Sequence, residues 1–247
     1  MSIHTHTARK RYRSALVLGV GLAGPALPTF ARADLHHDVA GELTSDYVYR
    51  QYSKSAGAPA ARLNVNLAAN SEYFGGLWVS AVNFTAARVE LNPYVGRSFR
   101  LDENWRINAA AEGYIFDRAV FGRHADYGEV YAQLQYRDLV TARVGLAIAA
   151  YGSRQQIPSV EITRRYQITD ICDLTGGIGY EGGSAAVRYD AAYWNVKLTY
   201  FLDPHLAFGV AYYGARHLHE HAPEAANEQF NEVVIGDRAV VSVSFGF

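Results

Sequence analysis

The chain has 247 residues, of which 49% are hydrophobic, 13% aromatic and 19% charged. This composition excludes a disordered chain, because it supplies enough apolar surface for a folded structure. Its 23 basic and 24 acidic residues nearly balance. Tyr is the commonest aromatic residue, with 18 copies, and it suits both strands and the boundary between lipid and water.

The first 33 residues have the layout of a secretory signal peptide. A basic stretch at 9–13 precedes an uncharged run from Ser14 to Leu27, and Ala31-Arg32-Ala33 matches a cleavage site. That run is too short for an ordinary membrane helix. We expect residues 1–33 to be removed, leaving 34–247 with 18 basic and 24 acidic residues. The remaining chain has no basic cluster, which argues against nucleic acid as a partner.

From Asp34 onward the sequence predicts an all-β protein, a transmembrane antiparallel β-barrel of about 12 strands with up-and-down topology. Segments of about ten residues alternate apolar and polar side chains, as a strand between lipid and a polar interior requires. The expected strands are 39–51, 61–70, 73–84, 88–101, 105–117, 126–137, 139–151, 159–169, 172–182, 188–202, 205–216 and 237–247.

Two strands illustrate the strength and the weakness of this pattern. In the second, Leu63, Val65 and Leu67 share one face and polar residues take the other. In the eighth, Arg164 falls on the lipid face, where an arginine at the bilayer centre costs about 2–4 kcal/mol. We therefore expect either a bulge there or an arginine near the membrane interface, whose side chain reaches the headgroups.

The connections favour a membrane barrel over a soluble sandwich. Tight turns follow the even strands, while the connections after the odd strands are mostly longer, and 218–236 is the longest. Bacterial outer-membrane barrels have short periplasmic turns and longer outer loops. Closure leaves no unpaired sheet edge in lipid. The sequence thus predicts a location in the cell outer membrane, with its lipid as a partner.

The last strand alternates apolar and small residues and ends with Phe245 and Phe247. A terminal aromatic on such a strand resembles the signature that the barrel assembly machinery recognises in outer-membrane proteins. We expect this machinery to be a partner and these two residues to carry the signal. The alternative is a buried strand that happens to end in Phe.

Several segments resemble a known family. Leu43-Thr44-Ser45-Asp46-Tyr47-Val48-Tyr49-Arg50 is similar to the opening strand of porins of the TorF type, and Tyr73 to Ser80 is similar to their next motif. Weaker similarity continues at Glu90-Leu91, 94–96 and 126–131. Gln51 departs from the pattern, in which Gly follows the arginine. The resemblance implies an outer-membrane channel without naming its solute.

Apolar faces directed at lipid would leave charged residues of both signs in the lumen. A 12-stranded barrel lies between those filled by side chains and those with an open channel. The sequence favours a narrow pore for small hydrophilic solutes or ions, and the alternative is a structural or adhesive barrel plugged by ion pairs. The residues expected to line the pore are Asp46, Arg50, Arg62, Glu90, Arg106, Glu112, Glu129, Arg143 and Lys197. Asp46 and Arg50, four apart on one strand, are the expected constriction pair.

Other chemistry has weaker support. His217, His219 and His221 alternate beside the longest loop, so they could converge on Zn or Cu, although a solvated loop is the simpler interpretation. Gly182-Gly183-Ser184 does not match the nucleophile motif G-x-S-x-G, which argues against an enzyme. The sequence predicts no cofactor and, with Cys172 as the single cysteine, no internal disulfide.

Overall fold

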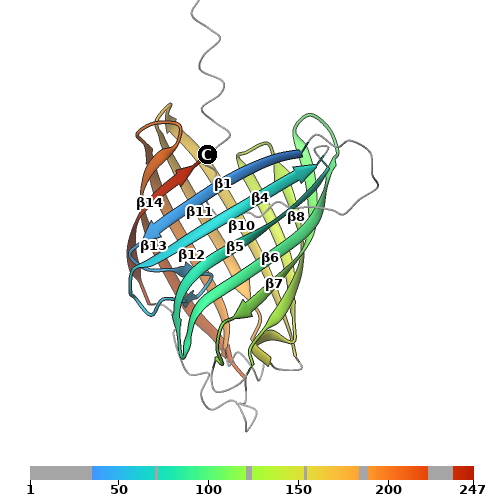
Figure 1. Cartoon of the computed structure of the whole chain (residues 1–247), viewed down its shortest axis with the longest axis vertical. Helices are drawn as coiled ribbons and strands as arrows, with labels where there is room; N and C mark the ends of the chain where they lie inside the picture. Colours follow the sequence, from blue (N-terminus) through green and yellow to red (C-terminus); the bar gives the residue numbers. More distant parts are fainter. Residues whose placement is uncertain (1–34, 70–71, 121–123, 153–154, 184–188, 222–235) are drawn as a thin grey trace, which may run out of the picture.

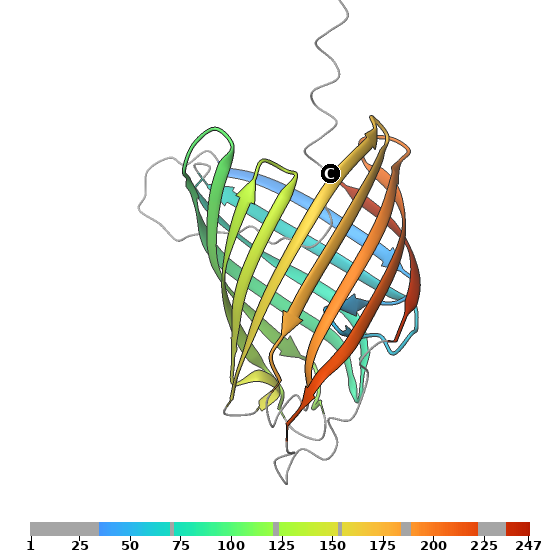
Figure 2. The ribbon, with the colours of Figure 1, turned by 180° about the vertical axis from the view of Figure 1, so that it is seen from behind.

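The computed structural model describes residues 35–69, 72–120, 124–152, 155–183, 189–221 and 236–247. Within these residues, twelve strands close into one antiparallel barrel, as the sequence predicts (Figure 1). The view from behind shows the same steeply tilted strands all round (Figure 2). The expected signal peptide, 1–33, lies outside the described residues.

The barrel strands agree with the predicted segments to within a few residues, except at β1 and β13. They are β1 (Leu35–Thr44), β4 (Ala60–Ala69), β5 (Tyr73–Phe84), β6 (Ala87–Arg100), β7 (Trp105–Phe116), β8 (Tyr127–Tyr136), β9 (Val140–Ile148), β10 (Gln156–Thr169), β11 (Cys172–Glu181), β12 (Tyr189–Phe201), β13 (Leu206–Glu220) and β14 (Arg238–Gly246). A short hairpin of β2 (Val48–Tyr49) and β3 (Tyr52–Ser53) forms a separate sheet.

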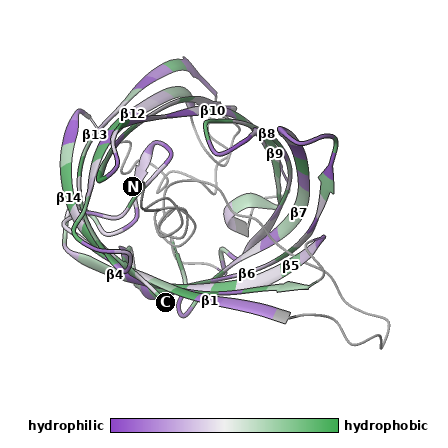
Figure 3. Ribbon diagram, turned by 90° about the horizontal axis from the view of Figure 1, so that it is seen from above, coloured by the Kyte–Doolittle hydropathy of each residue, from purple (hydrophilic) through white to green (hydrophobic). Residues whose placement is uncertain are grey.

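Each barrel strand pairs with its neighbours in the sequence, and β1 pairs with β14 to close the ring. Figure 3 shows this ring from the end that carries the C-terminus. The topology is therefore up-and-down, as expected. At the closure Gly41 faces Phe245 in register, and a side chain on Gly41 would collide with the Phe245 ring. Glycine at this position leaves room for the Phe245 ring to lie across the paired strands β1 and β14.

The outer surface of the barrel is apolar. Leu63, Val65 and Leu67 on β4 are exposed, as are Val196 and Leu198 on β12, and their inward neighbours are polar. A closed barrel with an apolar exterior satisfies every strand edge in lipid. In the part of the chain that the structure describes, no helix is long and apolar enough to cross a bilayer.

Connection lengths alternate as expected. The turns 101–104, 137–139 and 202–205 follow even-numbered barrel strands and are short, whereas 45–59 and 117–126 follow odd ones and are longer. The β5–β6 connection is the exception, because only Thr85 and Ala86 join these strands. A 3-10 turn, η2 (Ala150–Gly152), lies in the β9–β10 connection.

Arg164 lies on the outer face of β10, exposed, and its register partner is Val140 at the start of β9. It is therefore level with the periplasmic β8–β9 turn, and its side chain can reach the headgroups. The bulge in β10 lies further on, between Gln167 and Thr169. Because the bulge is not at Arg164, the register favours a position near the membrane interface, and the depth of this arginine in the bilayer stays a prediction.

Two strand boundaries were predicted wrongly. β1 ends at Thr44 instead of residue 51, and β13 continues to Glu220 instead of ending at 216. Alternation persists beyond Thr44, but the chain leaves the wall there because Asp46 finds partners in its own loop. The Asp46 carboxylate accepts hydrogen bonds from the hydroxyls of Ser53 and Ser55, at 2.5 and 2.8 Å.

Candidate functional site

Residues 45–59, here called the inward segment, leave the wall after β1 and fold into the lumen. The segment turns at Arg50, whose φ is 53°, and Lys54 donates its backbone N–H to the Tyr47 carbonyl at 2.7 Å. Gln51 and Lys54 are fully buried. A hydrophilic stretch is thus enclosed by the barrel, and its charges require partners there.

Arg50 fastens the tip of the hairpin to the wall. Its Nη2 lies 2.7 Å from Glu129 Oε1 and 2.9 Å from Oε2, and its Nη1 lies 3.2 Å from Glu181 Oε1. Gln51 donates to the other Glu181 oxygen at 3.0 Å. Arg143 lies on the neighbouring strand β9, and its Nη2 is 2.8 Å from Glu129 Oε1. These charge-assisted bonds join the segment to β8 and β11.

Lys54 makes a second buried ion pair. Its ammonium group lies 2.8 Å from both carboxylate oxygens of Glu90 on β6, and neither side chain is exposed. The ammonium also lies over the rings of Tyr49 and Tyr114, 4.4 and 4.8 Å from their centres. A buried pair of this kind has no solvent to replace either partner.

Between these ion pairs and the longer loops, aromatic side chains fill the outer end of the barrel. Tyr114 and Tyr127 stack with ring centres 4.4 Å apart, and Tyr52 of the inward segment packs edge-on against Tyr151. Tyr49 and Tyr114 share a hydrogen bond of 2.6 Å between their hydroxyls. On this side the inward segment is therefore held both by aromatic packing and by ion pairs. We call this side of the barrel the closed wall, and it comprises Glu90, Tyr114, Glu129, Arg143 and Glu181.

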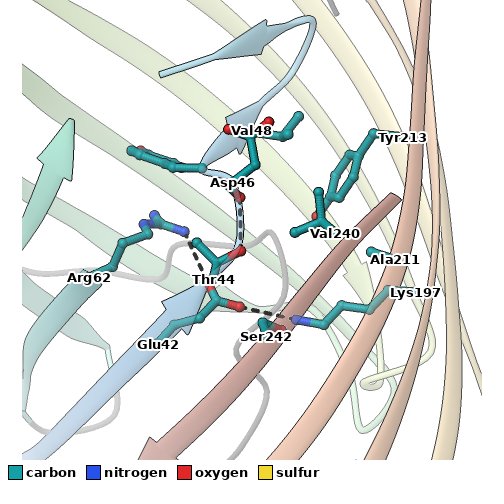
Figure 4. A pocket seen from close by; sticks show the side chains of 11 residues that line it. Glu42, Thr44, Asp46, Val48, Arg62, Lys197, Ala211, Tyr213, Val240 and Ser242 are labelled. Carbon is teal, nitrogen blue, oxygen red and sulfur yellow. Dashed lines mark hydrogen bonds and ion pairs between the residues drawn. The ribbon is translucent and has the colours of Figure 1, made fainter. Parts of the chain in front are cut away.

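The other side of the segment is less filled. A cavity of about 30 Å³ lies there, room for about two water molecules. Figure 4 shows Arg62 and Lys197 reaching the Glu42 carboxylate from opposite sides, at 3.5 and 3.3 Å. Small residues of β13 and β14, Ala211 and Ser242, complete this open wall, which comprises Glu42, Arg62, Lys197, Ala211 and Ser242.

The expected constriction pair was wrong in its geometry. Asp46 and Arg50 are both inside the barrel, but they lie on the inward segment and not on one wall strand. Arg50 binds Glu129 and Glu181, while Asp46 forms its ion pair with Arg238 at the start of β14.

Most other expected lumen residues lie on the inner face. Glu90, Glu112, Glu129 and Arg143 are buried in or beside the closed wall, and Arg62 and Lys197 belong to the open wall. Arg106 also lies on the inner face of β7, but it is exposed near the periplasmic end. Whether these residues line a conducting path stays a prediction.

Lys54 and Glu181 also face the lumen as partners in ion pairs, and the sequence did not predict this role for either. The strand register gives one sign that a cation must lie nearby, because Glu112 and Glu129 are directly opposite each other on β7 and β8. Like charges at opposed positions destabilise a sheet unless a cation lies between or beyond them. Arg143 and Arg50 fill that role, but their placement cannot be read before the register is known.

The histidines do not assemble a metal site in the described residues, where no group of three or more potential ligands lies close enough to hold an ion. His217 stacks on Tyr189 with ring centres 4.0 Å apart. His221 lies 2.7 Å from an Asp190 oxygen, and His219 meets it edge-on. Most of the long loop, 222–235, lies outside the described residues.

The chain ends inside the sheet. Phe247 exchanges two backbone hydrogen bonds with Val39, of 3.0 and 2.8 Å, and its ring stacks near His205. The Phe247 side chain is exposed on the outer surface, where a binding partner could reach it. Its role in assembly, and that of Phe245, stays a prediction.

Solved structures with the same fold are outer-membrane porins. The KdgM porin in complex with disordered oligogalacturonate has a TM-score of 0.55 and 10% identity, over 85% of this chain and 98% of that one. The NanC porin has a TM-score of 0.54 and 13% identity, over 85% and 99%. At this identity the likeness shows the fold. Together with the apolar exterior, it places the chain in the outer membrane.

No curated protein is similar enough in sequence to match this chain. The model of one bacterial family does match, over residues 31–247, a range that includes every strand of the barrel. The chain therefore belongs to the family described as "Bacterial protein of unknown function (Gcw_chp)".

Proposed function

We propose that this protein is a porin-like channel for passive diffusion of small hydrophilic solutes or ions. The inward segment is the constriction of that channel. The observation that carries the proposal is the difference between the two sides of this segment. One side is packed against the closed wall, while charged groups on the other side line a small cavity.

The solute class follows from the lumen charges. Both signs occur around the inward segment, for example Arg50 and Lys54 beside Glu90 and Glu129. KdgM is described in complex with an oligogalacturonate. Among the residues that the structure describes, the ion pairs leave no long, continuous run of positive side chains of the kind that an extended acidic oligomer requires. We propose small solutes instead.

The proposal includes the remaining expectations from the sequence. Export would remove residues 1–33, and the barrel assembly machinery would recognise the last strand. The resemblance of 43–96 to porins of the TorF type supports a channel, although the matching family model carries no such label. We propose no catalytic activity and no cofactor.

A second candidate is a plugged barrel that acts through its outer loops. The full burial of Lys54 and Glu90 favours it, because such a pair leaves no passage for water at that point. The two candidates differ in whether the open wall conducts.

The test is ion conductance of the purified, refolded protein in a planar lipid bilayer. Folding is checked beforehand by the different gel mobility of boiled and unboiled samples. Discrete current steps from folded protein would support the channel. Folded protein without current, at voltages that the bilayer withstands, would favour the plugged barrel.

A further inference from the structure

Charged side chains on the two sides of the inward segment differ in their access to water. On the closed wall, the side chains of Glu90 and Glu129 are 0% exposed, as is that of Lys54, the partner of Glu90 on the inward segment. On the open wall, 22% of the Arg62 side chain and 14% of Glu42 are exposed. Since both sets lie in the lumen, the charged groups of the open wall are more accessible to water than those of the closed wall.

Side-chain size explains this difference. The inner face of β13 carries Gly209 and Ala211, and that of β14 carries Ser242. The Lys197 stem lies so close over Gly209 that a Cβ there would come within 2.6 Å of it. Small residues therefore leave space for both the lysine and a cavity. On the closed side, the buried side chains of Tyr114, Tyr127 and Tyr151 fill the lumen instead.

Charges on the open wall do not cancel. Glu42 is shared between Lys197 and Arg62, so one carboxylate faces two cations. The other carboxylate at the cavity, Asp46, has its own partner in Arg238. Counted together with Arg238, which lies outside the cavity lining, the charged groups at the cavity sum to one positive charge.

Arg62 is held in a fixed position. Its guanidinium lies 4.2 Å from the centre of the Tyr47 ring and 4.6 Å from that of Trp78, and its Nε donates to Ser80 at 3.4 Å. A charge fixed between two rings keeps its place as a solute passes, which is what a selectivity element requires.

We infer that the conducting path is off-centre, passing between the inward segment and the open wall. Glu42, Arg62 and Lys197 form its selectivity constriction, with a preference for small anions. This inference rests on the proposed channel function. It replaces Asp46 and Arg50 as the residues that set ion selectivity, because Arg50 is paired with carboxylates of the closed wall and Asp46 is paired with Arg238.

The first test is the reversal potential across a KCl gradient, for wild type and single variants. Lys197→Gln should lower the chloride-to-potassium permeability ratio at least about threefold, the effect of one unit charge acting through water at about 6 Å. Arg62→Gln should act in the same direction, and Glu42→Gln should raise the ratio. Arg106→Gln is the control, since this charge lies on the inner face at the periplasmic end.

The second test maps the path directly, in a Cys172→Ser background. Ser242→Cys on the open wall should react quickly with a charged thiol reagent and lose current. Ser159→Cys is the matched control: Ser159 is also a buried inner-face serine, but its register partner is Glu181 on the closed side. It should react at least about tenfold more slowly.

These outcomes separate the inference from the proposed function. Folded wild type that passes no current contradicts the channel and, with it, this path. A conducting protein whose ion preference is unchanged in all three open-wall variants leaves the channel standing and refutes the constriction. Faster block through Ser159→Cys than through Ser242→Cys would place the path on the closed side and overturn the inference.

Discussion

Lys54→Met tests whether the buried ion pair holds the inward segment in the lumen. Met keeps most of the length of the lysine side chain but loses its charge. Glu90 would keep the Tyr47 hydroxyl, 3.5 Å away, in place of an ammonium group at 2.8 Å. Removing one partner of a fully buried pair costs about 3–5 kcal/mol, because it leaves the other charge unpaired.

That cost falls on the state in which the segment is packed in the barrel. The barrel strands keep their own hydrogen bonds, so the variant should still close. Since about 1.4 kcal/mol is a factor of ten, the ratio of packed to displaced segment should fall roughly 100-fold or more. Single-channel recording should then show long periods at a conductance above the main wild-type level.

Two variants serve as controls. Arg97→Met also removes an ion pair, with Glu72, but both side chains are about half exposed, and such pairs contribute at most about 1 kcal/mol. Adding Glu90→Gln to Lys54→Met removes the unpaired charge and should restore much of the wild-type behaviour. Folded Lys54→Met with wild-type conductance levels and dwell times would refute the role of this pair.

Three further predictions follow from other parts of the barrel. Gly96→Ala should destabilise the barrel by about 1–3 kcal/mol in denaturant titration, because its Cβ would lie 2.2 Å from the Ala109 carbonyl oxygen. Gly236→Ala is the control: Gly236 has open space around it, so this variant should be within about 0.5 kcal/mol of wild type. Deleting Phe247 should lower the amount of folded protein in outer-membrane fractions without abolishing export, and unchanged levels would contradict an assembly signal. Arg50→Ala removes the cation paired with buried Glu181 and leaves buried Glu129 with Arg143 alone, so it should shift the channel towards the larger conductance more than it changes ion preference, and the opposite result would count against its contact with the closed wall.

The alternation of apolar and polar residues was sufficient to predict the barrel. On β4 and β12 each second side chain meets lipid, and this local rule needs no knowledge of the partner strand. The same rule failed at 45–51, where alternation continues but the chain folds inward. What decides there is the set of partners: Arg50 binds Glu181, 131 residues later in the chain.

The sequence predicted which residues face the lumen more successfully than which of them form ion pairs with each other. Facing the lumen is a property of strand parity, so Glu90, Glu129 and Arg143 could be placed from the sequence. Pairing depends on the register between strands and on how deep a loop enters the barrel. Neither is encoded within a single segment, which is why Lys54 was not recognised as the partner of Glu90.

The join between β1 and β14 has a consequence for the order of assembly. Ser45, the first residue of the inward segment, donates its backbone N–H to the Val241 carbonyl at 2.9 Å, and its hydroxyl accepts from the Val241 N–H at 3.0 Å. These partners are 196 residues apart, and contacts at such separation form late in folding. A chain whose last strand has not yet paired therefore lacks the anchor at the base of the segment. We therefore expect the lumen to narrow and the sheet to close in one late step of assembly, and a damaged last strand to prevent both.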